Sequence, residues 1–392
     1  MDEQSIDDDW SENRSAFVQK NIEFTGPSPG PIFPDLTPLQ IVRRFMTDDI
    51  IEEIVAETNS FAVRDETRKR RRRSYGAAVQ STRLSTDEFW RFLAVVLLLE
   101  IHGKPSIDNN WSKNWLLFTP VFSQIMAQDR FRSILACLHF DSTETNTVQD
   151  RFSKFRKLFD IMRSRFKLAY NLDRQVTVDE SMMLWKGHHS LKRYIPNKAD
   201  AWGFKFYALA ESKSGYIYDL IVDEGAKTLT LDELSGRAGL LRTGAIVMKL
   251  MEPILDRGHI LGLDNFYTDV VLFKELIARE THCIGTIRAN RRFIPRAVSQ
   301  HKWKRNNREH LTVAYQKELY VFAWSDRRVV RVLSSIGSAD FVEGRPQAIF
   351  QYCEAMPGVD LADQKRHRKS VARSNSRAGT DVFSFIFSMS FS

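Results

Sequence analysis

Apolar residues recur at helical spacing in the first part of the chain. Thr37 and Pro38 have the chemistry of a helix cap and a first turn, and Ser85 opens a second segment with the pattern of a capping box. The predicted helices cover residues 37–54, 85–101, 121–126, 129–138 and 152–170. Because each segment keeps an apolar stripe at three- or four-residue spacing, residues 34–170 are predicted to form an all-α domain.

After residue 171 the apolar runs become short and alternate between strand-like and helix-like spacing. Lys213, Ser214 and Gly215 have the composition of a hairpin turn between two of these strands. The predicted elements are strands at 175–178, 203–210 and 216–222, a helix at 231–255, a strand at 259–263, a helix at 268–279 and a strand at 283–287. This order predicts an α/β fold with a ribonuclease H-like core, in which helices flank a mixed sheet.

The remaining segments complete the predicted domain organisation. The first residues are acidic and then rich in Gly, Pro and Ser, so we expect them to lack a fixed fold. The stretch before the last helix starts very basic and then continues as three strand-like runs. The predicted division is an acidic tail (1–33), the all-α domain (34–170), the first part of the core (171–289), a basic β-containing insertion (290–346), the last acidic helix of the core (347–379) and a C-terminal tail (380–392).

Three aspartates fall where a ribonuclease H-like core would carry acidic residues. Asp179 lies on the first predicted strand, Asp264 ends the fourth, and Asp360 lies on the last helix. Two Mg²⁺ ions about 4 Å apart stabilise the attacking and leaving oxygens of a phosphodiester, and Mg²⁺ prefers a few carboxylates as ligands. The three aspartates therefore predict a two-metal site. The structural alternatives are turn or helix capping by Asp179 and Asp264, and an ordinary helix N-terminal acid at Asp360.

Two further acidic residues lie next to these aspartates. Asp363 follows Asp360 by one helical turn, so both carboxylates are expected on one helix face, beside Gln364. Their mutual repulsion is a cost that a bound cation would offset. Glu180 is expected on the opposite face of its strand from Asp179, and it is not counted as a ligand.

Positive charge favours a polyanionic partner. The net charge is +8, and residues 68–73 are six consecutive basic residues. Such a run predicts nuclear import or a nucleic-acid contact, with a solvated loop as the alternative. Arg291 and Arg292 open the predicted insertion and are candidates for phosphate contacts, with the same alternative.

Other classes of protein are disfavoured. The chain has no apolar stretch of about 18 residues, so a membrane protein is not expected. Cys137, Cys283 and Cys353 occur singly, which predicts neither a disulfide framework nor a zinc site. His188 and His189 lie on a polar turn without a nearby cysteine, and we expect surface residues or phosphate contacts rather than metal ligands.

Several short motifs occur in a fixed order along the chain. They are TPL at 37–39, DRF at 129–131, LHF at 138–140, TVDESM at 177–182, YIPNK at 194–198, WGFK at 202–205, LDNFYT at 263–268 and GVDLADQ at 358–364. In this combination the chain resembles the piggyBac family of DNA transposases, including the domesticated proteins derived from them. The resemblance covers residues 34–373, which is most of the chain.

The resemblance implies a cut-and-paste transposase. Asp179, Asp264 and Asp360 match the catalytic aspartates of the family, and Asp363 matches a further acidic residue at the metal site. The implied cofactors are two Mg²⁺ or Mn²⁺ ions. The implied partner is double-stranded DNA, at transposon ends and at a TTAA target, with the protein acting as a homodimer in the nucleus. One strand would be nicked, the freed 3′-hydroxyl would form a hairpin, and the 3′ end would join the target.

Basic residues follow the first catalytic strand in the sequence. Lys186, Arg193, Lys198 and Lys205, with Lys192 among them, are expected to hold the DNA backbone without reading its sequence.

The chain departs from the family pattern at three places. A positive charge that usually precedes Gly358 is absent, and Asp269 stands where the family usually has serine. The family's closing helices and cysteine-rich zinc domain would lie beyond Ser392, so no zinc is expected in this chain. An active transposase therefore competes with a domesticated or truncated DNA-binding derivative that does not cleave. A two-carboxylate sugar hydrolase is a third class, but it explains neither the third aspartate nor the basic run.

Overall fold

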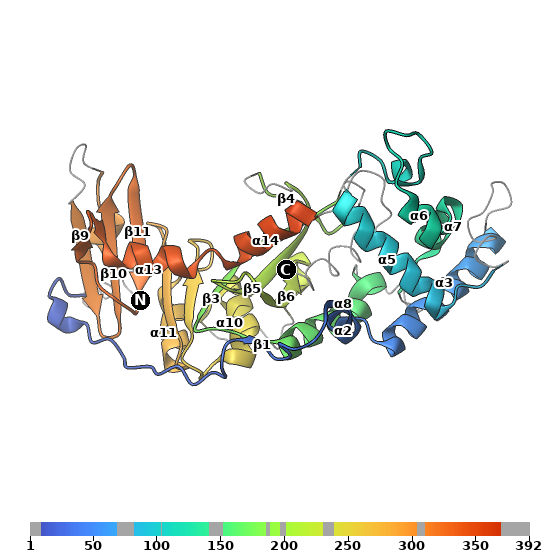
Figure 1. Cartoon of the computed structure of the whole chain (residues 1–392). Coiled ribbons are helices and arrows are strands. Elements are labelled where there is room, and N and C mark those ends of the chain that lie inside the picture. The colour runs from blue at the N-terminus through green and yellow to red at the C-terminus, as the bar shows by residue number, and fades with distance from the viewer. Residues whose placement is uncertain are drawn as a thin grey trace. The chain divides into compact units, whose positions relative to one another are not determined.

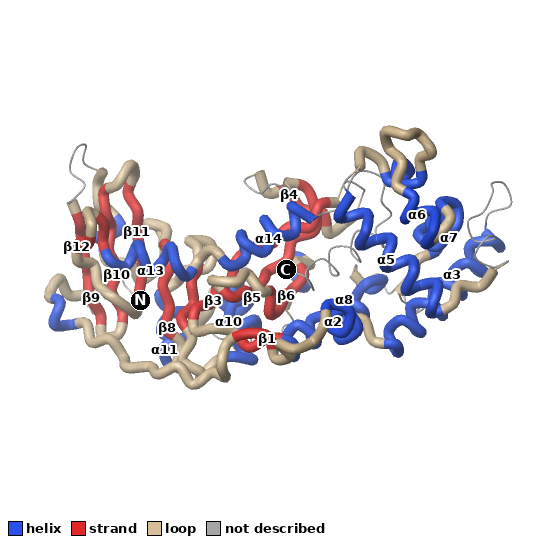
Figure 2. Tube along the Cα trace, viewed as in Figure 1, coloured by secondary structure: helices blue, strands red, loops and turns tan. Residues whose placement is uncertain are grey.

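The computed structural model describes residues 9–68, 82–102, 104–140, 152–185, 189–196, 201–229, 239–303 and 310–369. Figure 1 labels those helices and strands for which there is room, and Figure 2 distinguishes helices from strands by colour. The chain divides into two compact units. Unit 1 comprises Met1–Ile32, Ala169–Ser181 and Phe206–Asp363, and unit 2 comprises Phe33–Leu168, Met182–Lys205 and Gln364–Ser392.

A mixed sheet organises the second half of the chain. Within the described residues it holds nine strands in the order β4-β5-β3-β7-β8-β11-β10-β9, with β6 pairing with β5. Strand β4 and the first residues of β5 belong to unit 2. The bounds are β3 Gln175–Leu184, β4 Lys192–Tyr194, β5 Trp202–Glu211, β6 Ile217–Val222, β7 Ile260–Leu263, β8 His282–Thr286, β9 Leu311–Gln316, β10 Leu319–Ser325 and β11 Val329–Ser334.

The centre of this sheet is parallel and its sides are antiparallel. Strand β7 pairs in parallel with β3 on one side and with β8 on the other. The pairs β8–β11, β11–β10, β10–β9 and β5–β6 are antiparallel. A parallel pair requires a crossover connection, and helix α11 (Val270–Ala278) supplies it between β7 and β8. The predicted elements from residue 175 to residue 286 occur in the predicted order in the described residues, with the short strand β4 as an addition that was not predicted.

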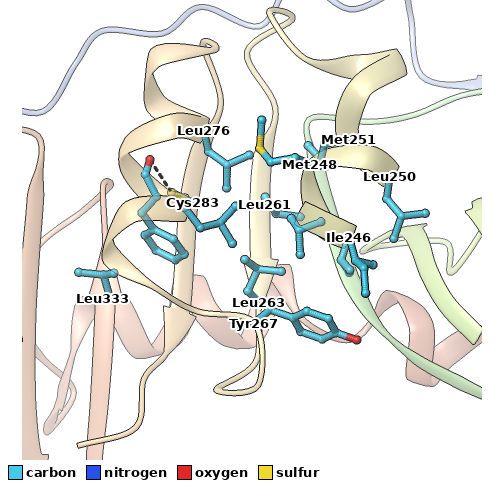
Figure 3. Close-up of a cluster of buried hydrophobic side chains, with 14 of the residues drawn as sticks. Ile246, Met248, Leu250, Met251, Leu261, Leu263, Tyr267, Leu276, Cys283 and Leu333 are labelled. Atoms are coloured by element: carbon cyan, nitrogen blue, oxygen red, sulfur yellow. Dashed lines mark hydrogen bonds between the residues drawn. The ribbon is translucent and has the colours of Figure 1, made fainter. Parts of the chain in front are cut away.

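Helices cover both faces of the unit 1 sheet. On one face, α10 (Arg242–Met251) and α11 pack on the apolar side chains of β3, β7 and β8. On the other face, Ala348 and Ala355 of α13 (Gln347–Ala355) pack against β8, β10 and β11. Figure 3 shows the first cluster, in which Leu261 and Leu263 of β7 lie among Ile246, Met248 and Leu276 from the helices. Because β7 is apolar and buried on both faces, it forms the centre of the core.

The predicted basic insertion extends the same sheet. Its three strands, β9 to β11, match the predicted runs, and β11 pairs with β8 between Ser334 and Ile284. The segment also holds α12 (Arg296–Ser299) and the short pair β12 (Phe341–Val342) and β13 (Arg345–Pro346). The final helix of the described residues is α14 (Gly358–Lys369).

Residues 9–32 were expected to lack a fixed fold, and this expectation is wrong. Ser11 exchanges two backbone hydrogen bonds with Tyr315 of β9, with N···O distances of 2.9 and 2.7 Å. Ile22 is buried, and β1 (Gly30–Pro31) pairs with β2 (Tyr170–Asn171). Composition alone missed these contacts because they are backbone pairings to distant strands, and few local side-chain signals encode them.

The described residues of unit 2 up to Leu168 form helices. Their apolar stripes meet in aromatic contacts such as Phe92 with Phe131, whose ring centroids are 5.1 Å apart. Thr37 caps the first helix with a capping box that includes Gln40. The helices are α2 Pro38–Phe45, α3 Asp48–Arg68, α5 Thr86–His102, α6 Pro120–Ile125, α7 Gln128–Cys137 and α8 Ser153–Ala169. A 3₁₀ turn at Ile107–Trp111 lies among them, and unit 1 has further 3₁₀ turns at Arg14–Ala16, Gly225–Thr228 and Glu252–Ile254. Of the described helices, none has the length and apolarity needed to cross a bilayer.

One predicted helix is shorter in the structure. The pattern predicts a helix over residues 231–255, whereas α10 begins at Arg242, and Gly239 adopts a positive φ of 89° just before it. Such a backbone conformation interrupts a helix and suits glycine. The predicted residues 231–238 lie outside the described part of the chain.

Acidification is expected to destabilise unit 1 through His282 of β8. Burial lowers the pKa of His282 from 6.5 to about 4, and the nearby positive charges of Arg174 and Lys20 act in the same direction. The folded protein therefore binds fewer protons than the unfolded chain, and stability present above pH 6.5 is lost as pH falls toward 4. From pH 7 to pH 5, the free energy of unfolding should fall by about 2 kcal/mol from this residue. Chemical denaturation at the two pH values measures the change.

The matched control is His282→Gln, which keeps a polar side chain but cannot gain the charge. Its unfolding free energy should depend on pH less steeply than that of the natural chain, by about 2 kcal/mol over the same range. The pKa of His259 is also lowered by burial, so part of the acid sensitivity should remain in the variant. An equal pH dependence in both proteins would contradict the role of His282.

Candidate active site

Asp179 and Asp264 lie where two neighbouring parallel strands stop pairing. The β3–β7 register pairs Val178 with Leu263; Asp179 is the next residue of β3, and Asp264 is the first residue after β7. Neighbouring strands are about 4.8 Å apart, so the register brings the two backbone positions to the same edge of the sheet. Two of the three predicted aspartates are thus brought together by strand pairing alone.

The loop after β7 holds Asp264 in a defined turn. Its carboxylate oxygen Oδ1 accepts a hydrogen bond from the backbone N–H of Phe266 at 2.7 Å, and its backbone oxygen accepts one from the Thr268 hydroxyl at 2.7 Å. Burial raises the pKa of Asp264, and the negative charge of Glu180 raises it further. Half-buried and close to other acids, this carboxylate is in a site where a cation would be stabilised.

Helix α14 packs along β3 on the face that Asp179 shares. The Ser181 hydroxyl donates to Oδ1 of Asp363 at 2.7 Å, and both groups are buried. At the start of the helix, a Cβ on Gly358 would lie 2.8 Å from Cγ2 of Thr177. Thr177, Asp179 and Ser181 alternate along the strand and therefore share one face. The close approach that Gly358 permits places the acidic helix against this face.

Asp360 and Asp363 differ in exposure although they lie one turn apart. Asp363 is buried beside Ser181, whereas Asp360 is exposed to solvent. The buried residues of α14, among those whose side chains are described, are Gly358, Val359, Ala362, Asp363 and Arg366, whereas Asp360 is exposed. Asp360 and Asp363 are one helical turn apart, as expected, but the Asp363 side chain is buried and the Asp360 side chain is exposed.

Sequence reasoning missed three residues near the aspartates. Tyr352 of α13 is largely buried, which raises its pKa, and the charges of Asp264 and Asp179 raise it further. Tyr267 is fully buried, which raises its pKa strongly, and the charges of Glu180 and Asp179 add to the shift. Glu180, set aside in the sequence, therefore acts electrostatically on Asp264 and Tyr267. The pairing of Tyr267 with Asp264 in one turn is the local signal that could have identified it.

The donor chemistry fits a hard divalent cation, because carboxylate oxygens are its preferred ligands. In the described residues, however, no three His, Cys, Asp or Glu side chains gather closely enough to hold a metal ion. The Asp264 carboxylate accepts a hydrogen bond from the Phe266 N–H in its own turn, and the Asp363 carboxylate accepts one from the Ser181 hydroxyl.

Arginines surround the loop that follows Asp264. Arg288 donates through Nε to Oδ1 of Asn265 at 2.8 Å, and Arg291 donates through Nη2 to the backbone oxygen of Asn265 at 3.0 Å. Arg292 pairs with Asp269, with Nε 3.2 Å from Oδ2. Asp269, the residue that departs from the family pattern, also caps α11 through Val271 N–H. Arg291 and Arg292, predicted as phosphate contacts, thus brace this loop.

The structure describes only some of the other residues that were predicted to contact DNA. Arg193 lies on β4 and Lys205 on β5, both in unit 2. Lys186 and Lys198 lie outside the described residues, as do His188 and most of the basic run at 68–73.

Comparison with known proteins places the chain in a family. The human PiggyBac transposable element-derived protein 3 is 26% identical over 359 residues, covering 86% of this chain and 57% of the relative. The human Chimeric ERCC6-PGBD3 protein is equally similar over 86% of this chain and 32% of its own length. The family model described as Transposase IS4 matches residues 37–392.

The chain belongs to the piggyBac transposase family. The resemblance inferred from the motifs is thereby confirmed. A solved piggyBac transposase, described as a synaptic complex with hairpin DNA, matches the fold with a TM-score of 0.81 at 22% identity, covering 93% of this chain and 76% of the other. Its likeness shows that this member shares the mixed α/β architecture of a piggyBac transposase. The chain spans little more than half the length of the first curated relative.

Proposed function

We propose that this chain is a piggyBac-type DNA transposase that cleaves and rejoins DNA strands. The observation that carries the proposal is the β3–β7 register, whose last pair is Val178 with Leu263, so that Asp179 and Asp264 are the residues that directly follow it. The acidic helix α14 packs on the same face of β3 through Ser181 and Asp363. We further propose that unit 1 is a ribonuclease H-like core.

The proposed ligands for two Mg²⁺ or Mn²⁺ ions are Asp179, Asp264, Asp360 and Asp363. When bound, such ions activate water and stabilise the leaving oxygen of a phosphodiester. Strand pairing supports the proposal by bringing the backbone of Asp179 and Asp264 to neighbouring positions, and the close approach of Gly358 to β3 supports it by packing helix α14, which carries Asp360 and Asp363, against the same strand. The half-buried position of Asp264 reduces competition from solvent for whatever its carboxylate binds.

Double-stranded DNA is the proposed substrate, with transposon ends and a TTAA target. Support comes from the net charge of +8 and from the solved relative, whose complex contains hairpin DNA. Arg193 and Lys205 are proposed backbone contacts. Action as a homodimer in the nucleus is part of the same proposal, and residues 68–73 supply the basic run for import.

A second function is a DNA-binding derivative that does not cleave. One relative is itself described as a transposable element-derived protein, and the described carboxylates do not gather as three ligands. Family membership is compatible with both functions.

Metal-dependent DNA cleavage by the full chain tests the proposal. Nicking of supercoiled plasmid DNA with Mn²⁺, suppressed by a chelator, is the expected result. Mn²⁺ should also raise the melting temperature, because a ligand that binds the native state stabilises it. Duplex binding without nicking, and without a melting shift, would favour the non-cleaving derivative. Absence of both binding and nicking would reject both functions.

A further inference from the structure

Strands β4 and β5 present two aromatic rings to solvent in unit 2. Tyr194 is 55% exposed and Trp202 is 52% exposed, although both are large apolar side chains. The register places them directly opposite each other, and their ring centroids are 4.6 Å apart at an interplanar angle of 37°. An exposed aromatic pair of this kind is a surface feature that often marks a binding site.

A second, buried aromatic pair lies next to Trp202 along the same strand. Phe204, two residues after Trp202 on the same face of β5, is buried and stacks on Trp185 with centroids 5.6 Å apart. Gly203 lies between them, where a Cβ would be 1.8 Å from the Met183 carbonyl oxygen. Only glycine allows β5 to approach β3 this closely. The aromatic pair therefore stands on a fixed backbone and loses little freedom when it binds a ligand.

Positive charge lies on both faces of this strand pair. The Lys192 ammonium is 5.1 Å from the centroid of the Trp202 ring, on the aromatic face. Strand alternation places Arg193 and Lys205 on the opposite face. An aromatic surface flanked by basic side chains matches the chemistry of a nucleotide, which has a flat base and a charged phosphate.

We propose that Tyr194 and Trp202 form a stacking platform for an unpaired DNA base, with Lys192 contacting the adjacent phosphate. The inference deepens the proposed DNA function and rests on it. Inside a duplex both faces of each base are covered by neighbouring base pairs, so away from the duplex ends only an unpaired nucleotide offers a face to these rings. The platform therefore distinguishes single-stranded from paired DNA, without reading sequence.

Fluorescence anisotropy of the full chain with a labelled single-stranded oligonucleotide and with the matching duplex tests the proposal. Trp202→Ala should weaken binding of the single strand about tenfold, as expected for one lost base–aromatic stack. Binding of the duplex should change less than about twofold, because the duplex contacts only charged groups. Trp202→Phe should retain most of the single-strand affinity, since a ring remains.

Trp115→Ala is the matched control, because Trp115 is 87% exposed in a different segment of unit 2. It should leave both affinities unchanged. Equal single-strand binding by Trp202→Ala and the natural chain would overturn the platform. Duplex binding by the natural chain with no single-strand binding would also overturn it while leaving the proposed function intact. Failure to bind either DNA would reject the DNA function itself, and the platform with it.

Discussion

Replacement of Asp264 by alanine should reduce metal-dependent DNA cleavage by at least about a thousandfold, because metal-centred charge stabilisation contributes several kcal/mol to such reactions. Asp264 directly follows β7, and Asp179 follows Val178, the β3 partner of the last β7 residue. Loss of one carboxylate should weaken the proposed metal site and displace the reacting phosphate. Initial rates of plasmid nicking, with the natural chain measured in parallel, give the ratio.

The control is Asp256→Ala. The Asp256 side chain is 49% exposed and pairs with Arg279, so its loss removes a carboxylate from unit 1 without touching the β3–β7 edge. Its nicking rate should remain within about threefold of the natural rate, as expected for a surface substitution. Both variants should melt cooperatively. Full nicking activity in Asp264→Ala would mean that Asp264 is not needed for DNA cleavage. The proposal that Asp179 and Asp264 form a metal site at the end of the β3–β7 pairing would then be wrong.

The largest expected effect on stability belongs to Phe273→Ala. Phe273 is fully buried in α11, packed in the cluster that joins this helix to β7 and β8. Truncation of a buried phenylalanine removes apolar contacts and leaves a cavity, at a cost of about 3–5 kcal/mol. The free energy of unfolding of the cooperative unit, measured by chemical denaturation, should fall by this amount.

Phe118→Ala is the control, because it removes the same side-chain atoms from an exposed position. Phe118 is 56% exposed, so its truncation should change the unfolding free energy by less than about 0.5 kcal/mol. Similar losses in both variants would mean that burial in the α11 cluster does not determine the stability of the chain.

The order of elements was largely predictable, because each depends on a local pattern. The alternating spacing after residue 171 predicted β7, α11 and β8 to within two residues at each end. The helix predicted at 231–255 was too long, since apolar residues continue past the point where Gly239 takes a positive φ. The spacing of apolar residues indicates which residues are buried, but it does not indicate where the backbone takes a positive φ and ends a helix.

The candidate site was predictable only where strand pairing determines it. Asp179 and Asp264 follow from the order of strands, whereas the exposure of Asp360 and the burial of Asp363 follow from how α14 packs on β3. The effect of Glu180 on the pKa of Asp264, and of Asp264 and Asp179 on the pKa of Tyr352, arises between residues distant in sequence. Neither effect has a local sequence pattern, so only a three-dimensional structure could reveal it.

The pairing of Ser11 with Tyr315 has a consequence for solubility. Strand β9 is the last in the order of the sheet, and an open edge strand is a template on which strands of other molecules can assemble. The backbone hydrogen bonds between Ser11 and Tyr315 occupy part of that edge, and the Val18 N–H donates to the backbone oxygen of Lys317 in the turn directly after it. Segment 11–18 is therefore expected to hinder the addition of a strand from another molecule to β9.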